Sequence, residues 1–363
     1  MTGVPYRRED AAAACARLEQ LGLFRSVELV GLEGDGGLDR AAMVVRVEEQ
    51  PYHRFEGAVG AQGDAGVVGL ANLELDNLAG TARAAGVRWE SRGHGVMNFG
   101  ARYAEPLVLG LPLKLEGAIE QLVQDTLYTR TGWSARARFA LSSRERIDAG
   151  YAQDRVVQPA GLVERAETQR TLFGLERVAL DRIAAPRRGT AVRLEAEQTF
   201  QREHQRPTGT RDLHSSALAL RAAWHRPLRG AAGLALELQA AGRFGYEGEL
   251  PVYERYPVGG AATLRGYNEE EFRVDRYGLS RLEWRWFLGS GGDRFVLLFW
   301  DHALMETRLP APTGYIPDRM NRDGYGFGLQ LPTPGGRAAL TYGLGAGSAP
   351  IDGKIHLQLQ STF

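Results

Sequence analysis

One arginine stands in a glycine-rich stretch late in the chain, where the residue types favour binding over catalysis. Residues 256–267 read Tyr-Pro-Val-Gly-Gly-Ala-Ala-Thr-Leu-Arg-Gly-Tyr, which places Arg265 in a predicted tight turn between strand-like segments. A guanidinium held in this way can form paired, charge-assisted hydrogen bonds to carboxylates. A glycine turn with a surface arginine is the alternative interpretation of the motif taken alone.

The chain offers little for catalysis or metal binding. Asp301 and His302 are adjacent, as the acid and base of a hydrolase can be, but no serine or cysteine lies in a recognisable nucleophile elbow. We therefore expect His302 to be an isolated histidine that faces the inside of the fold. The 7 histidines and the single cysteine lack metal-ligand spacing. We expect no catalytic residue, no metal, no cofactor and no enzymatic activity.

Composition excludes several classes of protein. The chain has 363 residues, a formal charge of zero and 44% hydrophobic residues, so it is neither a basic nucleic-acid binder nor a disordered chain. The longest apolar run covers residues 295–300, whereas a membrane-spanning helix needs roughly 18. A barrel stays possible, because its strands alternate lipid-facing and inward-facing residues.

The first residues carry no recognisable export signal. Residues 1–10 include two arginines, a glutamate and an aspartate where a signal peptide would need an apolar core. Four alanines before Cys15 faintly resemble a lipoprotein cleavage site, but no hydrophobic stretch precedes them. We expect Cys15 to be a small residue on the packed side of a helix.

A helix and two strands are predicted near the N-terminus. Apolar residues fall at helical spacing between residues 9 and 21, with acidic residues in the first turn and Gly22 at the end. An alternating run over residues 24–29 predicts a strand, and a Gly-Asp-Gly-Gly turn separates it from a second strand at 42–49.

The remainder of the chain predicts a single all-β architecture. Sixteen segments alternate with polar or glycine-rich turns, at about 19 residues for each strand with its connection, which suits membrane strands of roughly 9 to 11 residues. The predicted strands are 53–63, 66–77, 81–92, 94–104, 111–124, 129–142, 144–156, 168–181, 188–202, 212–226, 231–244, 274–288, 293–302, 322–332, 336–345 and 353–363. The last strand alternates most clearly, although a soluble sandwich could share this pattern; its apolar face consists of Ile355, Leu357, Leu359 and Phe363.

Six motifs together carry a family resemblance. Besides Arg-Gly-Tyr, five segments stand in the order found in the Omp85 superfamily, which comprises outer-membrane barrels that insert or translocate other proteins; they are residues 77–81, 103–106, 181–189, 281–285 and 298–301. A chain that stops on Phe363 after an alternating strand also resembles the C-terminal signal of bacterial outer-membrane barrels. The resemblance implies a mainly β fold, a sixteen-stranded antiparallel transmembrane β-barrel over residues 52–363.

The N-terminal segment resembles the back half of a POTRA domain, an α+β module that precedes such barrels in the periplasm. Residues 1–51 contain the expected helix and two strands, and they lack the strand and helix that begin a complete module. We therefore predict a partial POTRA domain, and a chain that is truncated at its N-terminus or assigned the wrong start codon. The resemblance implies a bacterial outer-membrane location, with this domain in the periplasm.

The family also implies roles for individual residues. The loop that carries Arg265, Gly266 and Tyr267 should fold back into the barrel lumen, where Arg265 would pair with Glu283 and Asp301. Two further glycines, Gly259 and Gly260, would allow the loop to bend. Because the family usually has a small residue and a glycine after its aspartate, and His302-Ala303-Leu304 stand here, the turn geometry there is open. A purely stabilising role for Arg265 is equally open.

The implied function is the insertion or translocation of proteins, without reaction chemistry. The first and last strands would meet in a weak lateral seam, which includes Phe55, Gly57 and Gly60. Partners would be outer-membrane lipid, unfolded outer-membrane or secreted proteins, and periplasmic accessory proteins, with no nucleic acid. A passive porin and the membrane half of a patatin-phospholipase fusion are the alternatives, and the BamA-like, TamA-like and patatin-fused branches are not distinguished.

Overall fold

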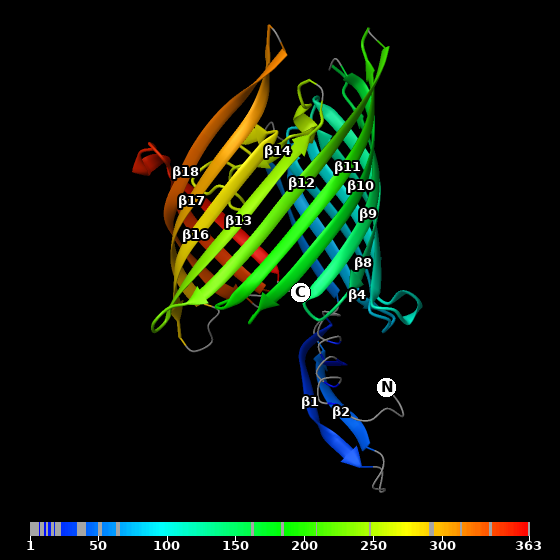
Figure 1. Ribbon diagram of the computed structural model, residues 1–363, viewed down its shortest axis with the longest axis vertical. Coiled ribbons are helices and arrows are strands. Elements are labelled where there is room, and N and C mark those ends of the chain that lie inside the picture. Colours follow the sequence, from blue (N-terminus) through cyan, green and yellow to red (C-terminus); the bar gives the residue numbers. More distant parts are fainter. Residues whose placement is uncertain are drawn as a thin grey trace. The chain divides into compact units, whose positions relative to one another are not determined.

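The structure is a computed structural model built almost wholly of antiparallel strands (Figure 1). It describes residues 23–34, 41–49, 53–62, 66–160, 163–182, 185–207, 209–246, 248–289, 294–312, 314–333 and 336–361, together with isolated positions among the first 22. Within these residues, we find no helix with the length and apolar character needed to cross a membrane.

The N-terminal segment contains a separate two-stranded sheet. Strand β1 (Phe24–Gly34) pairs with β2 (Ala41–Glu49) in antiparallel register. The predicted helix at 9–21 and the turn after Gly34 lie mainly outside the described residues. The described positions within that predicted helix are helical, and they are Ala11, Ala14, Cys15 and Leu18.

The main sheet has sixteen strands, and the predicted count is therefore confirmed. Each strand pairs with its neighbours in the order of the chain, because short turns favour antiparallel hairpins. The strands are β3 (His53–Gln62), β4 (Gly66–Leu78), β5 (Arg83–Gly93), β6 (Val96–Glu105), β7 (Leu113–Gln124), β8 (Tyr128–Ala140), β9 (Glu145–Val157), β10 (Val163–Leu180), β11 (Gly189–Gln205), β12 (Gly209–Pro227), β13 (Ala232–Phe244), β16 (Arg276–Leu288), β17 (Arg294–Ala311), β18 (Gly314–Thr333), β19 (Gly336–Gly345) and β20 (Lys354–Ser361).

The chain comprises two compact units. One consists of Met1–Thr171 and Gln201–Asp212, and the other consists of Leu172–Phe200 and Leu213–Phe363. Strands β3 to β9 belong to the first unit, and β13 and β16 to β20 belong to the second. The arginine loop and its surroundings lie entirely within the second unit.

Residues along each strand alternate between two faces, as a period of two requires. In β17 one face carries buried side chains such as Phe295, Phe299 and Asp301, and we call this the inner face. The opposite, outer face carries exposed apolar side chains such as Leu298 and Trp300. The same alternation in β20 exposes Ile355 and Leu357 on the outer face and buries His356.

One predicted loop is wrong. Residues 303–321 were expected to connect two strands, but β17 and β18 continue through them as a hairpin, with Leu309 opposite Ile316. After Glu306, β17 pairs only with β18 in the described registers. Before Gly324, β18 likewise pairs only with β17. Each of these two strand segments therefore has one unpaired edge. A proline can lie at such an edge, because no neighbouring strand would accept a hydrogen bond from the N–H group that proline lacks. After Asp301, where the turn geometry was open, β17 continues as strand.

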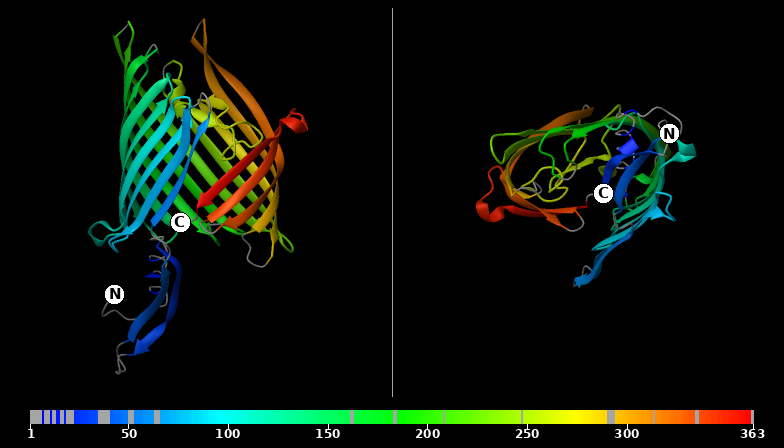
Figure 2. Two further views of the ribbon diagram at one scale, coloured as in Figure 1. Left: turned by 180° about the vertical axis from the view of Figure 1, so that it is seen from behind. Right: turned by 90° about the horizontal axis from the view of Figure 1, so that it is seen from below.

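The connection between β13 and β16 is a long structured loop, residues 245–275, which we call the arginine loop. It contains a short 3-10 helix, η3 (Val252–Glu254), and a small hairpin of β14 (Tyr256–Val258) with β15 (Phe272–Val274). The loop lies against the inner face of β16 to β18 (Figure 2). Its buried apolar contacts with these strands are made by Val258, Leu264, Val274, Leu279, Ala303 and Met305.

Candidate functional site

Arg265 reaches the inner face of two neighbouring strands and binds a carboxylate on each. Its Nε donates to Asp301 Oδ2 at 2.8 Å and its Nη2 donates to Asp301 Oδ1 at 2.6 Å, which forms a bidentate fork on β17. Its Nη1 donates to Glu283 Oε1 on β16 at 2.6 Å. The backbone N–H of Arg265 also donates to Asp301, at 3.1 Å. The structure thus brings together the three residues that the resemblance paired.

The surroundings of Arg265 strengthen this arrangement. The guanidinium carbon lies 3.8 Å from the centre of the Phe299 ring, in cation–π geometry. The side chain of Arg265 is 3% exposed and that of Asp301 is 0% exposed. Burial alone would lower the pKa of Arg265, but the hydrogen bond to Asp301 and the charge of Glu283 outweigh it, so that the pKa lies above its usual value.

Gly266 and Tyr267 continue the contact toward the C-terminal strands. Gly266 adopts a φ of +92°, and a Cβ there would lie 2.6 Å from the Leu344 carbonyl carbon. Its N–H donates to Nε2 of His356 on β20 at 3.3 Å. The Tyr267 hydroxyl donates to the Asp323 carbonyl on β18 at 3.1 Å. Only glycine fits at position 266 because both the left-handed backbone and the close approach exclude a side chain.

The two preceding glycines shape the loop. Gly259 and Gly260 have φ values of +119° and +93°. The Gly259 N–H donates to Thr263 Oγ1 at 2.8 Å, and that hydroxyl donates back to the Gly259 carbonyl at 2.9 Å. Glu269 accepts from the Ala261 N–H at 2.7 Å. These local bonds hold the turn that presents Arg265.

Two other arginines of β16 complete the inner-face cluster. Their only sequence signal is their place in the 281–285 motif. Arg281 donates to the Ala261 and Ala262 carbonyls of the arginine loop at 3.2 and 3.3 Å. Arg285 donates from Nε to Glu283 Oε2 at 2.8 Å. Glu283 therefore accepts hydrogen bonds from the guanidinium groups of both Arg265 and Arg285. This arrangement can fix a loop in place, and it contains no acid–base pair arranged for proton transfer.

A second buried arginine anchors the same loop. Arg243 on β13 binds Glu254 of η3, with Nη2 and Oε2 3.2 Å apart, and both residues are 6% exposed. Arg243 also donates to Thr199 at 2.9 Å and to Ser215 at 3.1 Å. Sequence reasoning missed this pair, because neither residue belongs to the recognised motifs.

The turn between β10 and β11 approaches the cluster from the opposite end of the strands. Ala185 is 1% exposed and packs with Phe287 and Phe295 on the inner face. Arg285 Nη1 donates to the Pro186 carbonyl at 3.5 Å. The guanidinium of Arg187 lies 4.2 Å from the centre of the Phe287 ring. A continuous set of contacts thus runs from this turn through Arg285 and Glu283 to Arg265.

The predicted seam and C-terminal residues occupy the ends of the sheet. Strands β3 and β20 stand first and last in the strand order. Phe55 on β3 is 71% exposed, and a Cβ on Gly57 would touch its ring at 3.0 Å, whereas Gly60 has more space. The backbone of Leu359 lies in β20, and Phe363 lies outside the described residues.

His302 does not face inward, and that expectation is wrong. It shares the outer face of β17 with Leu298 and Trp300, because an even-numbered residue of this strand points away from Asp301. Its Nδ1 lies 2.8 Å from Asp323 Oδ1 on β18, and Trp300 Nε1 donates to the same oxygen at 3.1 Å. Among the described residues, we find no cluster of histidine, cysteine and acidic side chains suited to a metal ion.

Comparisons with known proteins identify the family through one family model and the fold through solved structures. A family model, the Omp85 superfamily domain, matches residues 77–363, which is more than half of the chain. No curated protein matches. Among solved structures, the chain is similar to BamA from Haemophilus ducreyi lacking POTRA domains 1–3, with a TM-score of 0.64, 17% identity, and coverage of 99% of this chain and 79% of that chain.

A second similar structure is CdiB from Escherichia coli, with a TM-score of 0.62, 14% identity, and coverage of 98% of this chain and 71% of that chain. CdiB from Acinetobacter baumannii is also similar, with a TM-score of 0.55, 12% identity, and coverage of 94% and 65%. These similarities show the fold, a sixteen-stranded antiparallel β-barrel, and the inner face of its strands lines the lumen.

Proposed function

The chain belongs to the Omp85 superfamily of outer-membrane barrels, and from this premise we propose that it inserts or translocates other proteins at the bacterial outer membrane. The observation that carries the proposal is the binding of Arg265 to Asp301 and Glu283, which holds the arginine loop against the lumen wall. The work is mechanical, because the cluster offers binding geometry and no nucleophile or proton relay.

The arginine loop also supports this proposal over a passive pore. A porin needs an open aqueous lumen, whereas here buried loop residues pack against the inner face of β16 and β17. The cluster around Arg265 stabilises that packing. Two separate buried arginines, Arg265 and Arg243, anchor this loop.

The route for the substrate in this proposal is a seam between β3 and β20. Strand β3 contains Gly57 and Gly60, which contribute no side-chain packing, and local opening there should require little free energy. A freed strand edge presents unpaired N–H and C=O groups, to which an extended segment of an unfolded protein can add as a new strand. The substrates would therefore be unfolded outer-membrane or secreted proteins.

The N-terminal segment fits the same proposal as the C-terminal part of a POTRA domain. Residues 1–51 include the β1–β2 hairpin, and Cys15 lies at one of the described helical positions. We place this domain in the periplasm, where it would meet substrates and accessory proteins. An exposed two-stranded sheet can receive an extended peptide by strand addition.

Reconstitution provides the test. The protein would be inserted into liposomes, an unfolded outer-membrane barrel would be added, and the folded fraction would be followed by its altered gel mobility. We expect the protein to accelerate folding, and a cysteine pair that crosslinks β3 to β20 to abolish the acceleration until the disulfide is reduced. Large, steady ion currents together with no acceleration of folding would instead identify a passive channel.

A further inference from the structure

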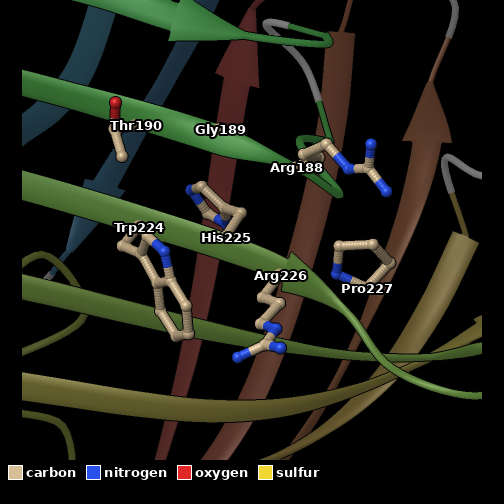
Figure 3. Close-up of a pocket in the computed structure, with 7 residues that line it drawn as sticks. All are labelled: Arg188, Gly189, Thr190, Trp224, His225, Arg226 and Pro227. Carbon is tan, nitrogen blue, oxygen red and sulfur yellow. The ribbon is translucent and has the colours of Figure 1, made fainter.

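A recess opens where β11 begins and β12 ends. It has a volume of about 500 Å³, within the range of roughly 300–1,000 Å³ that small-molecule sites occupy. Figure 3 shows the side chains around it, which come from the start of one strand and the end of the next. The lining residues are Arg188, Gly189, Thr190, Trp224, His225, Arg226 and Pro227.

The recess lies at the level of a membrane interface. Trp224 stands on the outer face three residues before the end of β12, and it is 38% exposed. Trp284 and Trp286 stand on the outer face near the end of β16 at the same edge of the sheet, and they are 55% and 53% exposed. Tryptophans on a barrel surface gather at the boundary between hydrocarbon and headgroups. Arg226 lies two residues beyond Trp224, on the headgroup side.

The side chains that line the recess include two arginines and no acidic residue. Arg188 and Arg226 are both exposed. Among the described residues, neither guanidinium has an ion pair or a hydrogen bond, in contrast to the other lumen and rim arginines discussed above. Two cations that line one recess and form no ion pair among the described residues favour an anionic occupant.

The donor set suits a phosphate group. Each guanidinium presents planar, paired N–H donors that match two phosphate oxygens, and Thr190 adds a hydroxyl donor at the same recess. Trp224 and Pro227 supply apolar surface beside these donors. A ligand with an anionic head and an apolar continuation satisfies both halves of the lining.

We infer that this recess binds the phosphodiester headgroup of an anionic phospholipid. Arg188 and Arg226 would hold the phosphate, and the acyl chains would run along the outer face beside Trp224. The outward orientation of Trp224 favours a lipid over a soluble phosphate, because a soluble anion gains nothing from apolar surface at the hydrocarbon boundary. The inference depends on the barrel fold alone, and it is independent of the proposed insertion activity.

The recess is also connected to the inner-face cluster. His225 lines it from the inner face, and its Nδ1 lies 3.4 Å from Nη1 of Arg285. Arg285 in turn binds Glu283, the partner of Arg265. Two side chains, those of His225 and Arg285, would therefore link an occupied headgroup site to Glu283, which binds Arg265 in the arginine loop.

Native mass spectrometry of the protein in detergent micelles tests the inference. Phosphatidylglycerol and phosphatidylcholine with identical acyl chains would be added in turn, and their retention compared for the wild type, an Arg188→Gln/Arg226→Gln variant and an Arg202→Gln control. Arg202 is an exposed arginine of β11 that pairs with Asp212. We expect the wild type and the control to retain phosphatidylglycerol about tenfold better, and the double variant to lose this preference.

Two further arms make the outcome decisive. An Arg188→Lys/Arg226→Lys variant keeps the charge, so a partial preference should survive, and heat-modified gel mobility shows that each variant is folded. Equal retention of both lipids by the wild type, or an unchanged preference in the double glutamine variant, overturns the inference. Displacement of phosphatidylglycerol by an equal concentration of glycerol 3-phosphate would assign the recess to a soluble phosphate instead.

Discussion

Arg265 and Asp301 form a two-pronged hydrogen-bonded pair that joins the arginine loop to the wall of the barrel, with N–O distances of 2.8 and 2.6 Å. Asp301 has no exposed surface, so its charge depends on this arginine and on Arg281, whose Nε lies 3.7 Å from Oδ2. Truncation of one partner would leave the other charge buried with too few partners, and that situation is strongly destabilising.

Replacement of Arg265 by alanine should lower the free energy of unfolding by about 3 to 5 kcal/mol. Arg202→Ala removes an arginine whose pair with Asp212 is more than half exposed on both sides, and it should cost about 0 to 1 kcal/mol. Urea titration followed by gel mobility would measure both. Equal losses for the two variants would show that Arg265 behaves as a surface arginine.

A double-mutant cycle should reveal coupling between Arg265 and each of its acids. Asp301→Ala and Glu283→Ala should each lose much of their effect when Arg265 is already alanine, because one shared cluster is being removed. The free energies of unfolding of the single and double variants provide the measurement. Additive effects with both acids would show that Arg265, Glu283 and Asp301 do not stabilise the protein as one cluster.

A methyl group at Gly324 should release the arginine loop. The glycine lies on β18 opposite Asp301, and a Cβ there would collide with the Arg265 carbonyl oxygen. We expect Gly324→Ala to cost about 1 to 3 kcal/mol and to expose the loop to protease. Gly278→Ala on β16 is the matched control, since no atom lies within 4 Å of its Cβ position. Protection of the loop in both variants would contradict the close contact.

Ala185→Glu should open the lumen at the turn between β10 and β11. The larger glutamate side chain would overfill the close packing of residue 185 against Phe287 and Phe295, so the turn should leave the inner face. Planar-bilayer recordings should then show a larger conductance than the wild type. Leu228→Glu in the turn after β12 introduces the same group at an exposed position, and it should leave the conductance unchanged.

Alkaline pH should loosen the arginine loop through Tyr256. Burial raises the pKa of Tyr256 to about 12, above its ordinary value of 10.0. Because the folded state favours the protonated phenol, the contribution to stability is complete below pH 10 and is lost as the pH rises through about 12. The difference in phenolate absorbance between the wild type and Tyr256→Phe would follow this titration. A phenolate that forms near pH 10 in the folded protein would show that Tyr256 is solvated.

Local patterns predicted most of the sheet. Alternation and turn residues identified all sixteen strands, because each strand has one polar and one apolar face. The extension of β17 and β18 was missed because Pro310, Gly314 and Pro317 resemble a loop, and only pairing beyond the neighbouring strands reveals a hairpin. The Asp301-His302 motif does not indicate a face by itself, whereas strand alternation places His302 on the face opposite to Asp301.

The site was predictable only in part. Arg265, Glu283 and Asp301 could be paired because the family resemblance joins three distant segments. Arg243 and Glu254 could not, since no local spacing relates a strand residue to a loop residue that packs beside it. The contact of Arg285 with Pro186 joins residues separated by 99 positions, and it arises because the turn between β10 and β11 packs on the inner face of β16.

The contact between Gly266 and His356 has a consequence for the order of assembly. These residues are 90 positions apart, and His356 belongs to the last strand of the sheet. Whatever sequence of events forms the other strands, the arginine loop gains its full set of bonds only after β20 has joined. Closure of so large a loop is costly in entropy and comes late. The complete set of loop contacts therefore requires the last strand, β20, to be in place.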